Sequence, residues 1–292
     1  MKKSHLRKPD WIKSKLPGTG SFKDIKEKIR KKKLATVCVE ASCPNLGKCW
    51  SEGTMTIMIL GEVCSRNCRF CDVKSQLEGF NITDPDPKEP VNIANSLAEL
   101  NSSFAVITSV TRDDLPDQGA NHWVEVIREI KKKNIGVEVL VPDFRGKTSL
   151  IDLIIKENPE VFAHNIEVVR RLSPEVRPEA NYQRSLNVLS HAAQSKMTIK
   201  SSLMLGMGET QQEIIETMSD LQKAGTQILT LGQYLAPSRK HHRVEKYYTP
   251  EHFAEFQEIG EKMGFSAVKS GPLVRSSFQA KELYEKIVGI KK

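Results

Sequence analysis

The stretch TMTIMILGEVCSRNCRFC runs from Thr54 to Cys71 and joins an apolar segment to three cysteines within eight residues. The apolar part has the length and composition of a buried β-strand. The cysteines follow where such a strand ends, with the spacing C-x3-C-x2-C. A closed structural zinc site uses four protein ligands, and this loop offers three sulfurs with no histidine nearby. Three thiolates on a four-iron cubane cluster would leave one iron open to a small molecule.

Further apolar runs follow along the chain, each bounded by turn residues, and amphipathic stretches lie between them. We predict strands at residues 54–63, 104–110, 136–143, 161–167, 198–206 and 228–235. We predict helices at 121–133, 182–194 and 210–225, the last with a Thr cap and an end at Gly225. Strands buried on both faces and joined by helices form parallel sheets. This order predicts an α/β fold, a partial or open (β/α)6 barrel.

Polar loops come directly after the predicted strands, in phase with them: TRDDLPDQGA, PDFRG, HNIE, GMGET and QYLAPS. Ordinary turn chemistry explains any single one of them, but their phase matches a barrel, whose sites are built at the carboxyl ends of strands. We divide the chain into an N-terminal extension (1–53), a barrel (54–263) and a C-terminal extension (264–292). Both extensions are expected to pack over the barrel mouth.

Composition and charge narrow the classes of function. With 292 residues, 39% hydrophobic and 27% charged, the chain suits one large domain with small extensions. Its apolar runs are too short to span a membrane, and the N-terminus lacks the apolar region of a signal peptide, so we predict a cytoplasmic protein. Reducing conditions there favour free cysteines. The net charge is +8, with basic runs at 28–33 and 131–133 that no aromatic residues interrupt, which favours solvated helix faces.

The segment CSRNCRFC resembles the signature of the radical S-adenosylmethionine (radical SAM) enzymes. The resemblance implies that Cys64, Cys68 and Cys71 bind a [4Fe-4S] cluster whose open iron chelates S-adenosylmethionine. One electron then cleaves that molecule to methionine and a 5′-deoxyadenosyl radical. Phe70 matches an aromatic position of the family whose neighbourhood contacts adenine.

A second triad, Cys38, Cys43 and Cys49, has the spacing C-x4-C-x5-C. Taken alone, it could be a zinc knuckle that lacks its fourth ligand. The resemblance becomes closer with the segments CVEASCPNLGKCW, TSVTRDDLPDQGA, VPDFRG, HNIE, KSSLMLGMGET, LTLGQYLAPSRKH and GPLVRSSF. Together these segments, spread over about residues 36–280, resemble the lipoyl synthase family.

The resemblance implies that the second triad holds an auxiliary [4Fe-4S] cluster whose fourth ligand is a serine of the family's R-S-S-Y motif. Here the motif reads Arg275-Ser276-Ser277-Phe278, and Ser277 is the implied ligand. An oxygen ligand is more labile than a thiolate, which suits a cluster that must open. The alternative for Ser277 is a hydroxyl bonded to local backbone. Phe278 in place of Tyr, and Val168 in place of a family Thr, affect no iron ligand.

The resemblance further implies a sulfurtransferase that acts on octanoyl-lysine of a lipoyl-carrier domain, such as a 2-oxoacid dehydrogenase E2 subunit or the glycine cleavage H protein. The methylene carbons of that chain have no acidic proton, so a hydrogen atom must be abstracted, at C6 and then at C8. Sulfur comes from the auxiliary cluster, and two molecules of S-adenosylmethionine are used. Expected partners are ferredoxin or flavodoxin as electron donor and an iron-sulfur carrier that rebuilds the cluster. No nucleic acid and no membrane is expected to bind.

Polar residues near predicted strand ends are our candidates for holding S-adenosylmethionine: Thr108, Ser109, Arg112, Asn165, Glu167 and Lys200. Each also has an ordinary interpretation as a turn or strand-end residue. His241 and His242 are adjacent in a predicted loop, where histidines are usually solvated. Two other functions stay open at this point: sulfur insertion into a free small molecule, as in biotin synthase, and a zinc-stabilised nucleic-acid-binding protein, consistent with the pI of 9.1.

Overall fold

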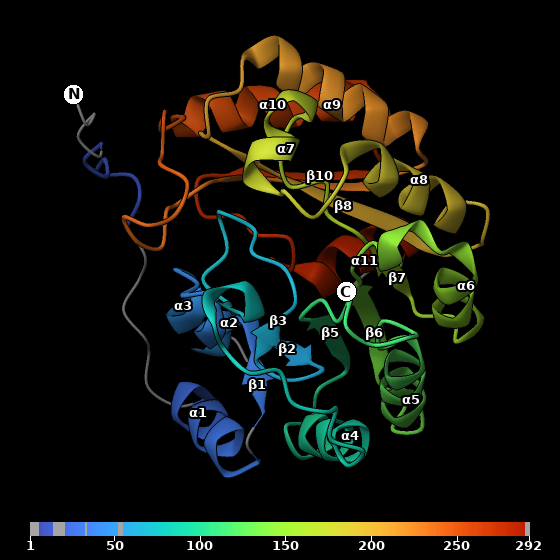
Figure 1. Cartoon of the computed structure of the whole chain (residues 1–292). Helices are drawn as coiled ribbons and strands as arrows, with labels where there is room; N and C mark the ends of the chain where they lie inside the picture. Colours follow the sequence, from blue (N-terminus) through green and yellow to red (C-terminus); the bar gives the residue numbers. More distant parts are fainter. Residues whose placement is uncertain (1–5, 14–20, 33, 52–54, 290–292) are drawn as a thin grey trace. The chain divides into compact units, whose positions relative to one another are not determined.

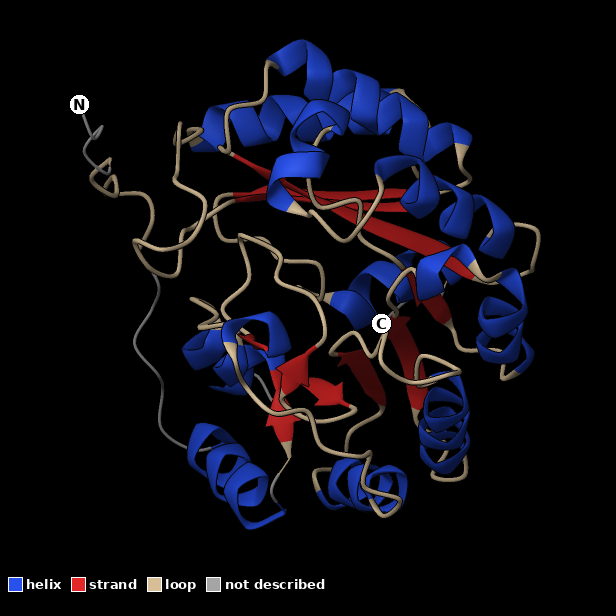
Figure 2. Ribbon diagram, in the orientation of Figure 1, coloured by secondary structure: helices blue, strands red, loops and turns tan. Residues whose placement is uncertain are grey.

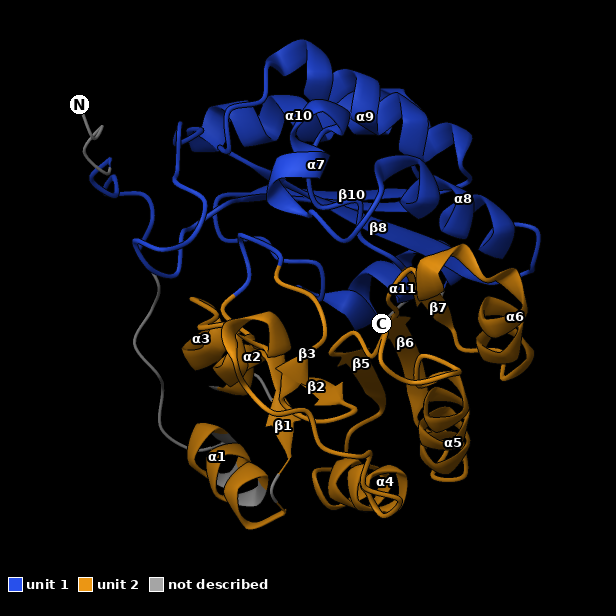
Figure 3. Cartoon of the chain, in the orientation of Figure 1, with its two compact units in different colours: residues 1–13, 68–71, 164–292 blue, residues 14–67, 72–163 orange. Residues whose placement is uncertain are grey.

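The computed structural model describes residues 6–13, 21–32, 34–51 and 55–289 (Figure 1). The chain forms two compact units (Figure 3). Unit 1 contains residues 1–13, 68–71 and 164–292, and unit 2 contains residues 14–67 and 72–163. The predicted boundary at residues 53 and 54, and Lys33 of the first basic run, lie outside the described residues. The three-part division stays a prediction.

Unit 2 contains mainly parallel strands. The strand β2 (Thr56–Ile59) pairs with β5 (Phe104–Ser109), β5 with β6 (Gly136–Leu140), and β6 with β7 (Val161–Ala163), all in parallel. On the other edge of β2, β1 (Ala35–Thr36) runs antiparallel. All of β2 is buried, as its continuous apolar run indicates. The N-terminal extension therefore contributes an edge strand.

The remaining elements of unit 2 surround these strands. They are α1 (Ser21–Lys32), α2 (Val37–Glu40), α3 (Leu46–Ser51), β3 (Val63–Cys64), β4 (Lys74–Ser75), η1 (Gln76–Glu78), α4 (Glu89–Glu99), α5 (Ala120–Lys131), η2 (Phe144–Gly146) and α6 (Thr148–Lys156). In α5, Trp123, Ile127 and Ile130 recur at spacings of three and four residues and are fully buried. That spacing gives the helix one apolar face, as the sequence predicted.

Unit 1 contains the parallel strands β8 (Thr198–Leu205), β9 (Ile228–Gln233) and β10 (Ala267–Gly271). Its helices are η3 (Arg170–Leu172), α7 (Ser173–Val176), α8 (Tyr182–Ala192), α9 (Gln211–Lys223), α10 (Pro250–Lys262) and α11 (Ala280–Val288). Helices α8, α9 and α10 lie along one side of these strands (Figure 2). The predicted cap of α9 is confirmed, because Thr210 and Glu213 form a capping box. Among the described helices, none is long and apolar enough to cross a membrane.

Three strand predictions needed correction. The first apolar run stops at Ile59, because Leu60 and Gly61 turn the chain with φ of 69° and 94°. The strand predicted at 161–167 ends at Ala163; Glu167, with φ of 66°, makes only an isolated bridge to Leu203. The prediction also missed β10, whose polar second half weakens the strand signal.

Candidate iron-sulfur sites

The N-terminal triad lies on two short helices of unit 2. Cys38 is in α2, Cys49 is in α3, and Cys43 lies between the helices. The backbone N–H of Cys43 donates to the Cys38 carbonyl at 3.1 Å, and that of Cys49 donates to Asn45 at 2.8 Å. All six cysteines of the chain are free thiols. None of the three is therefore tied up in a disulfide, and their role as cluster ligands stays a prediction.

Two cysteines of this triad belong to an apolar cluster. Cys38 and Trp50 are buried in it, and Cys49 packs against them. The cluster also contains Phe22, Ile25, Ile29, Leu46, Met55 and Leu100. Burial raises the pKa of the Cys38 thiol, and the N–H groups of Thr56 and Trp50 oppose this only partly.

The indole of Trp50 is an unsatisfied donor beside a sulfur. Its Nε1 is buried and has no hydrogen-bond partner among the described residues, yet it lies close enough to Cys38 to favour a thiolate there. A buried N–H without an acceptor is costly, and a cluster sulfur or its thiolate ligand would supply one. The donor set and this unpaired N–H fit an iron-sulfur cluster.

No three His, Cys, Asp or Glu side chains of the described residues converge to hold a single metal ion. A cubane cluster differs from a single ion because its iron atoms keep its thiolate ligands apart. In unit 2, the Ser42 hydroxyl donates to Asp72 Oδ2 at 2.6 Å. This bond ties the loop between Cys38 and Cys43 to the residue after Cys71.

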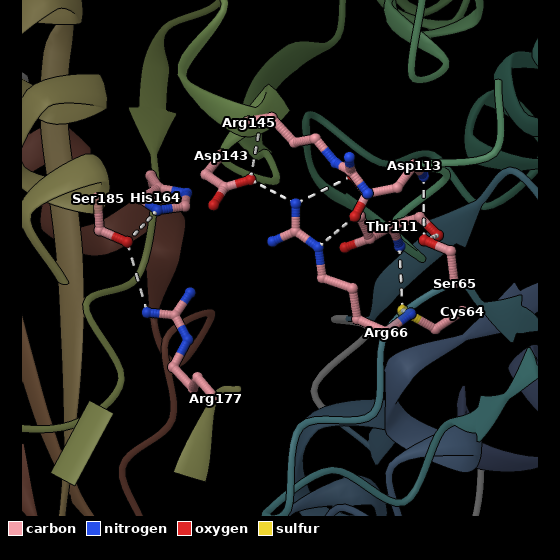
Figure 4. A network of polar contacts seen from close by, with 10 residues as sticks. All are labelled: Cys64, Ser65, Arg66, Thr111, Asp113, Asp143, Arg145, His164, Arg177 and Ser185. Atoms are coloured by element: carbon pink, nitrogen blue, oxygen red, sulfur yellow. Dashed lines mark hydrogen bonds and ion pairs between the residues drawn. The ribbon is translucent and has the colours of Figure 1, made fainter. Parts of the chain in front are cut away.

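Cys64 is the last residue of β3 in unit 2, and its sulfur receives two backbone hydrogen bonds. The N–H groups of Arg66 and Thr111 each donate to its Sγ at 3.4 Å. The Ser65 hydroxyl donates to the Thr111 carbonyl at 3.0 Å and accepts from the Asp113 N–H at 3.0 Å. The cysteine loop is thereby fastened to the loop after β5 (Figure 4). Hydrogen bonds to a sulfur are one means by which a protein tunes a bound cluster.

A buried ion-pair network holds the same loop. The Arg66 guanidinium donates to Asp113 at 2.7 and 3.0 Å and to Asp143, after β6, at 2.7 Å (Figure 4). Burial would lower the pKa of Arg66, but both carboxylates together raise it above its ordinary value. Arg145 approaches Asp113 at 3.3 Å from the outside. The network joins the loops after three neighbouring strands, and no local sequence pattern predicted it.

The three candidates for S-adenosylmethionine in unit 2 differ in what they do. Thr108 donates its hydroxyl to the Leu140 carbonyl at 3.1 Å. Ser109 has a buried hydroxyl with no partner in the described part of the chain. Arg112 is almost fully buried, pairs with Asp114 at 2.8 Å and donates to the Leu60 carbonyl at 3.2 Å. Of the three, only Ser109 has a side-chain oxygen without a hydrogen-bond partner among the described residues.

In unit 1, Cys68 and Cys71 close a turn, with the Cys71 N–H donating to the Cys68 carbonyl at 3.0 Å. The Arg69 N–H donates to the Val176 carbonyl at 2.9 Å. His241 Nε2 lies 3.0 Å from the Cys71 carbonyl, and the His242 N–H donates to the Arg69 carbonyl at 2.7 Å. The expectation that these histidines are merely solvated is wrong, because both brace the cysteine loop.

The other candidates lie after β7 and in β8. Asn165 donates to Glu167 Oε1 at 3.0 Å, while its own Oδ1 is buried without a partner among the described residues. Burial raises the pKa of Glu167, although Arg177 and Asn165 oppose the shift. Lys200 is fully buried in β8. Glu167 also has a positive φ, which strains any residue other than glycine. Such strain is found mainly where the surroundings enforce it, often at functional sites, so Glu167 is a candidate for a functional role.

A second polar group supports this loop. His164 Nε2 lies 2.9 Å from the Ser185 hydroxyl (Figure 4). The Arg177 guanidinium donates to the Ile166 carbonyl at 2.9 Å. Arg177 is buried, and the sequence analysis did not single it out. Its position directly after α7 carried no recognisable sequence pattern.

Two organising residues of unit 1 were also missed. Glu209 accepts from the N–H groups of Gly206 and Met207 at 2.5 and 2.9 Å. Gln233, fully buried, donates to the carbonyls of Leu205, Tyr234 and Lys246. A Cβ on Gly206 would lie 2.1 Å from Gln233 Nε2. The polar loops predicted after β8 and β9 are therefore built around one side-chain amide.

The C-terminal motif packs against β9. A Cβ on Gly232 would lie 2.0 Å from the Val274 carbonyl, so only glycine allows this approach. Arg275 donates to the same carbonyl at 2.7 Å, and the Phe278 N–H closes a turn on the Arg275 carbonyl at 3.0 Å. Ser277 lies within this turn, is half-buried, and its hydroxyl has no partner among the residues that the structure describes.

Comparisons with known proteins decide the family. Residues 58–221 match the radical SAM superfamily, and residues 1–43 match the N-terminal domain of lipoyl synthase of that family. A lipoyl synthase of Parabacteroides distasonis is 49% identical over 280 residues, covering 95% of this chain and 98% of its own. One of Treponema denticola is 49% identical over 278 residues, covering 94% of both chains. The chain belongs to the lipoyl synthase family.

Solved structures support the fold of this lipoyl synthase family member. The FeFe-hydrogenase maturase HydG of Carboxydothermus hydrogenoformans has a TM-score of 0.56 at 13% identity, covering 90% of this chain and 77% of its own. Methylornithine synthase (PylB) has a TM-score of 0.56 at 12% identity, with 73% and 70% covered. These likenesses show the fold alone, and they confirm the predicted class of open α/β barrel.

Membership confirms the predicted family and enzyme class, a radical SAM sulfur-inserting enzyme of the lipoyl synthase family. A radical SAM enzyme uses a [4Fe-4S] cluster and S-adenosylmethionine. Neither the biotin synthase type nor a zinc-stabilised nucleic-acid-binding protein is favoured by these relatives.

Proposed function

We propose that this enzyme inserts sulfur at C6 and C8 of an octanoyl-lysine on a lipoyl-carrier domain. The observation that carries the proposal is the second triad. Cys38, Cys43 and Cys49 lie along one short segment of unit 2, and Cys38 and Cys49 share an apolar cluster with an unpaired indole N–H. Hydrogen abstraction alone needs one cluster, whereas sulfur insertion also needs a sulfur source. A second set of thiols in apolar surroundings provides the ligands for one.

The first role is to hold the radical-generating cluster with Cys64, Cys68 and Cys71. When bound, this cluster supplies the electron that cleaves S-adenosylmethionine, and the auxiliary cluster supplies sulfur. The chain fixes the two parts of the loop independently: Arg66 anchors Cys64 in unit 2, and His241 and His242 brace residues 68–71 in unit 1. Rigid support of this kind holds ligands in their reactive geometry.

The second role is to orient S-adenosylmethionine. Among our candidates, Ser109 and Asn165 each carry a buried polar atom that lacks a partner in the described residues, so a ligand can satisfy them. Glu167 has a raised pKa because it is buried, and a bound cation would favour its ionised form. Thr108, Arg112 and Lys200 are proposed to shape the surrounding loops. Phe70 is proposed to lie near the adenine.

Ser277 is proposed as the oxygen ligand of the auxiliary cluster. The alternative, a hydroxyl bonded to local backbone, would show as a hydrogen bond, and Ser277 makes none with the described residues. The turn from Arg275 to Phe278 holds this hydroxyl in place. A hydroxyl ligand leaves iron more readily than a thiolate does, which suits sulfur release.

The partners follow from this reaction. Octanoylated carrier domains, such as a 2-oxoacid dehydrogenase E2 subunit or the glycine cleavage H protein, supply the substrate. A ferredoxin or flavodoxin supplies electrons, and an iron-sulfur carrier rebuilds the auxiliary cluster. We place the reaction in the cytoplasm, where thiols stay reduced.

The test is anaerobic incubation of the reconstituted chain with an octanoyl-lysine peptide, S-adenosylmethionine and dithionite, followed by mass spectrometry. We expect the peptide to gain two sulfur atoms while 5′-deoxyadenosine accumulates. Deoxyadenosine formed beside an unchanged peptide would contradict the substrate assignment.

Two adjacent serines, Ser276 and Ser277, allow a controlled test of the proposed oxygen ligand. Ser277→Ala should lower product formation while deoxyadenosine still forms, and Ser276→Ala, in the same turn, serves as the control. Mössbauer spectra of the auxiliary cluster should change only in the Ser277 variant. An unchanged spectrum and an unchanged yield would exclude Ser277 as a ligand.

A further inference from the structure

A charged cavity of about 720 Å³ opens within unit 1. Its lining includes the basic side chains of Arg69, Arg171, Arg239, Lys240 and Arg243. Two carboxylates, on Glu175 and Glu245, also face it. The function described so far assigns no role to this cavity.

Part of this charge is already neutralised. Arg243 pairs with Glu245, His242 lies 3.6 Å from Glu175, and Arg171 pairs at 2.7 Å with Glu213, outside the cavity. The remaining cations, Arg69, Arg239 and Lys240, are exposed and form no ion pair with any residue that the structure describes. The cavity therefore presents a net positive surface to solvent.

The wall of the cavity is joined to the cysteine loop. Arg69 lies between Cys68 and Cys71, and its carbonyl accepts the His242 N–H at 2.7 Å. His241, which also lines the cavity, lies 3.0 Å from the Cys71 carbonyl and 2.9 Å from the Ser238 hydroxyl. A molecule bound here would contact the backbone that carries two ligands of the proposed radical-generating cluster.

We propose that this cavity is the docking site of an acidic electron-transfer protein that reduces the cluster at Cys64, Cys68 and Cys71. The inference rests on the proposed function, because that cluster must receive one electron for each S-adenosylmethionine cleaved. The donor centre loses one electron and the cluster gains it, and no bond forms between the proteins. Electron-transfer complexes have small interfaces and are transient, and complementary charge steers the two proteins together. An octanoyl chain, in contrast, needs apolar walls.

A double charge reversal, Arg239→Glu with Lys240→Glu, tests the proposal in the full, reconstituted chain. The matched control is Lys196→Glu with Lys223→Glu, which changes the net charge equally at exposed positions of unit 1 that do not line the cavity. The cluster is reduced either with a reduced acidic flavodoxin or with dithionite, and its absorbance is followed by stopped flow. Binding of fluorescently labelled flavodoxin is titrated separately.

The cavity variant should be reduced by flavodoxin at least about tenfold more slowly than the control at low salt, with a flatter salt dependence. Its reduction by dithionite should equal that of the control. Equal rates with flavodoxin in both variants would overturn the proposal, as would a loss of binding to an octanoylated carrier domain in place of flavodoxin. If the wild-type chain binds flavodoxin, the cavity variant does not, and no deoxyadenosine forms, docking stands and the proposed function fails.

Discussion

The two cysteine triads are built on opposite physical principles. Cys38 and Cys49 lie in an apolar cluster with Trp50, and hydrogen bonds run along one short segment, residues 38–49, that carries the triad. Cys64 lies beside a buried ion-pair network and receives two amide hydrogen bonds, while Cys68 and Cys71 belong to the other unit. A local, apolar site suits the proposed auxiliary cluster, which would give up its sulfur and be rebuilt. A site fastened to several strand ends suits one that must keep its geometry through each turnover.

Removing each triad should separate the two halves of the reaction, and this is the largest expected effect. With Cys64, Cys68 and Cys71 all changed to Ala, no 5′-deoxyadenosine should form. With Cys38, Cys43 and Cys49 changed to Ala, deoxyadenosine should still form but no sulfur should enter the peptide. Chromatography and mass spectrometry of the same reaction measure both. Sulfur insertion by the second variant would show that the N-terminal triad is not the source.

The ion-pair network should matter more for stability than the exposed pairs do. Arg66→Met leaves Asp113 and Asp143 buried without their shared partner, which should cost about 3–5 kcal/mol of unfolding free energy. Arg171→Ala, which breaks an exposed pair with Glu213, should cost less than about 1 kcal/mol. Denaturant unfolding of the apo chain measures both. Equal losses would mean that the network does not anchor the Cys64 loop.

Trp50→Phe should affect the N-terminal site alone. Phenylalanine keeps the apolar packing and removes the N–H, so the auxiliary cluster should still assemble but lose one hydrogen bond to sulfur. Its midpoint potential should then fall, because such bonds stabilise the reduced, more negative state. Potentiometric titration followed by EPR measures this in a chain that retains only the N-terminal triad. An unchanged potential would place the indole N–H away from the cluster.

The smallest effect concerns acid stability. Burial raises the pKa of Asp113, but Arg66 and Arg145 outweigh it, so the folded pKa lies below the ordinary 3.8. A depressed pKa contributes stability above the unfolded value, and this stability is lost as pH falls below about 3.8. The free energy of unfolding, measured at a series of pH values between about pH 5 and pH 2.5, should therefore fall less in Arg66→Met than in wild type. Glu213, whose pKa is lowered to about 2 mainly by Arg171, should titrate identically in both proteins.

Much of the architecture could be predicted, because continuous apolar runs such as Thr56–Ile59 and capped helices such as Gln211–Lys223 carry local signals. Prediction from local sequence patterns failed where contacts between distant residues determine whether a strand forms or ends. The strand β7 stops at Ala163, before the predicted end at residue 167, and β10 was missed because its pairing with β9 is a tertiary contact. The same reason hid Arg66, which bonds to Asp113 and Asp143, and Gln233, which bonds to Leu205, because these partners are distant in sequence. Cysteine spacing, in contrast, is a local signal; it indicates both triads, whose role as cluster ligands stays a prediction.

One isotope measurement tests the central claim, that the cluster at Cys38, Cys43 and Cys49 supplies the sulfur and the cluster at Cys64, Cys68 and Cys71 supplies the radical. The chain is reconstituted with iron and ³⁴S-sulfide, freed of excess sulfide, and given octanoyl-lysine peptide, S-adenosylmethionine and dithionite for one turnover. Our account predicts two ³⁴S atoms in each product peptide from the wild-type chain, and none from the variant without Cys38, Cys43 and Cys49. Unlabelled sulfur in the wild-type product, or labelled product from that variant, would contradict it.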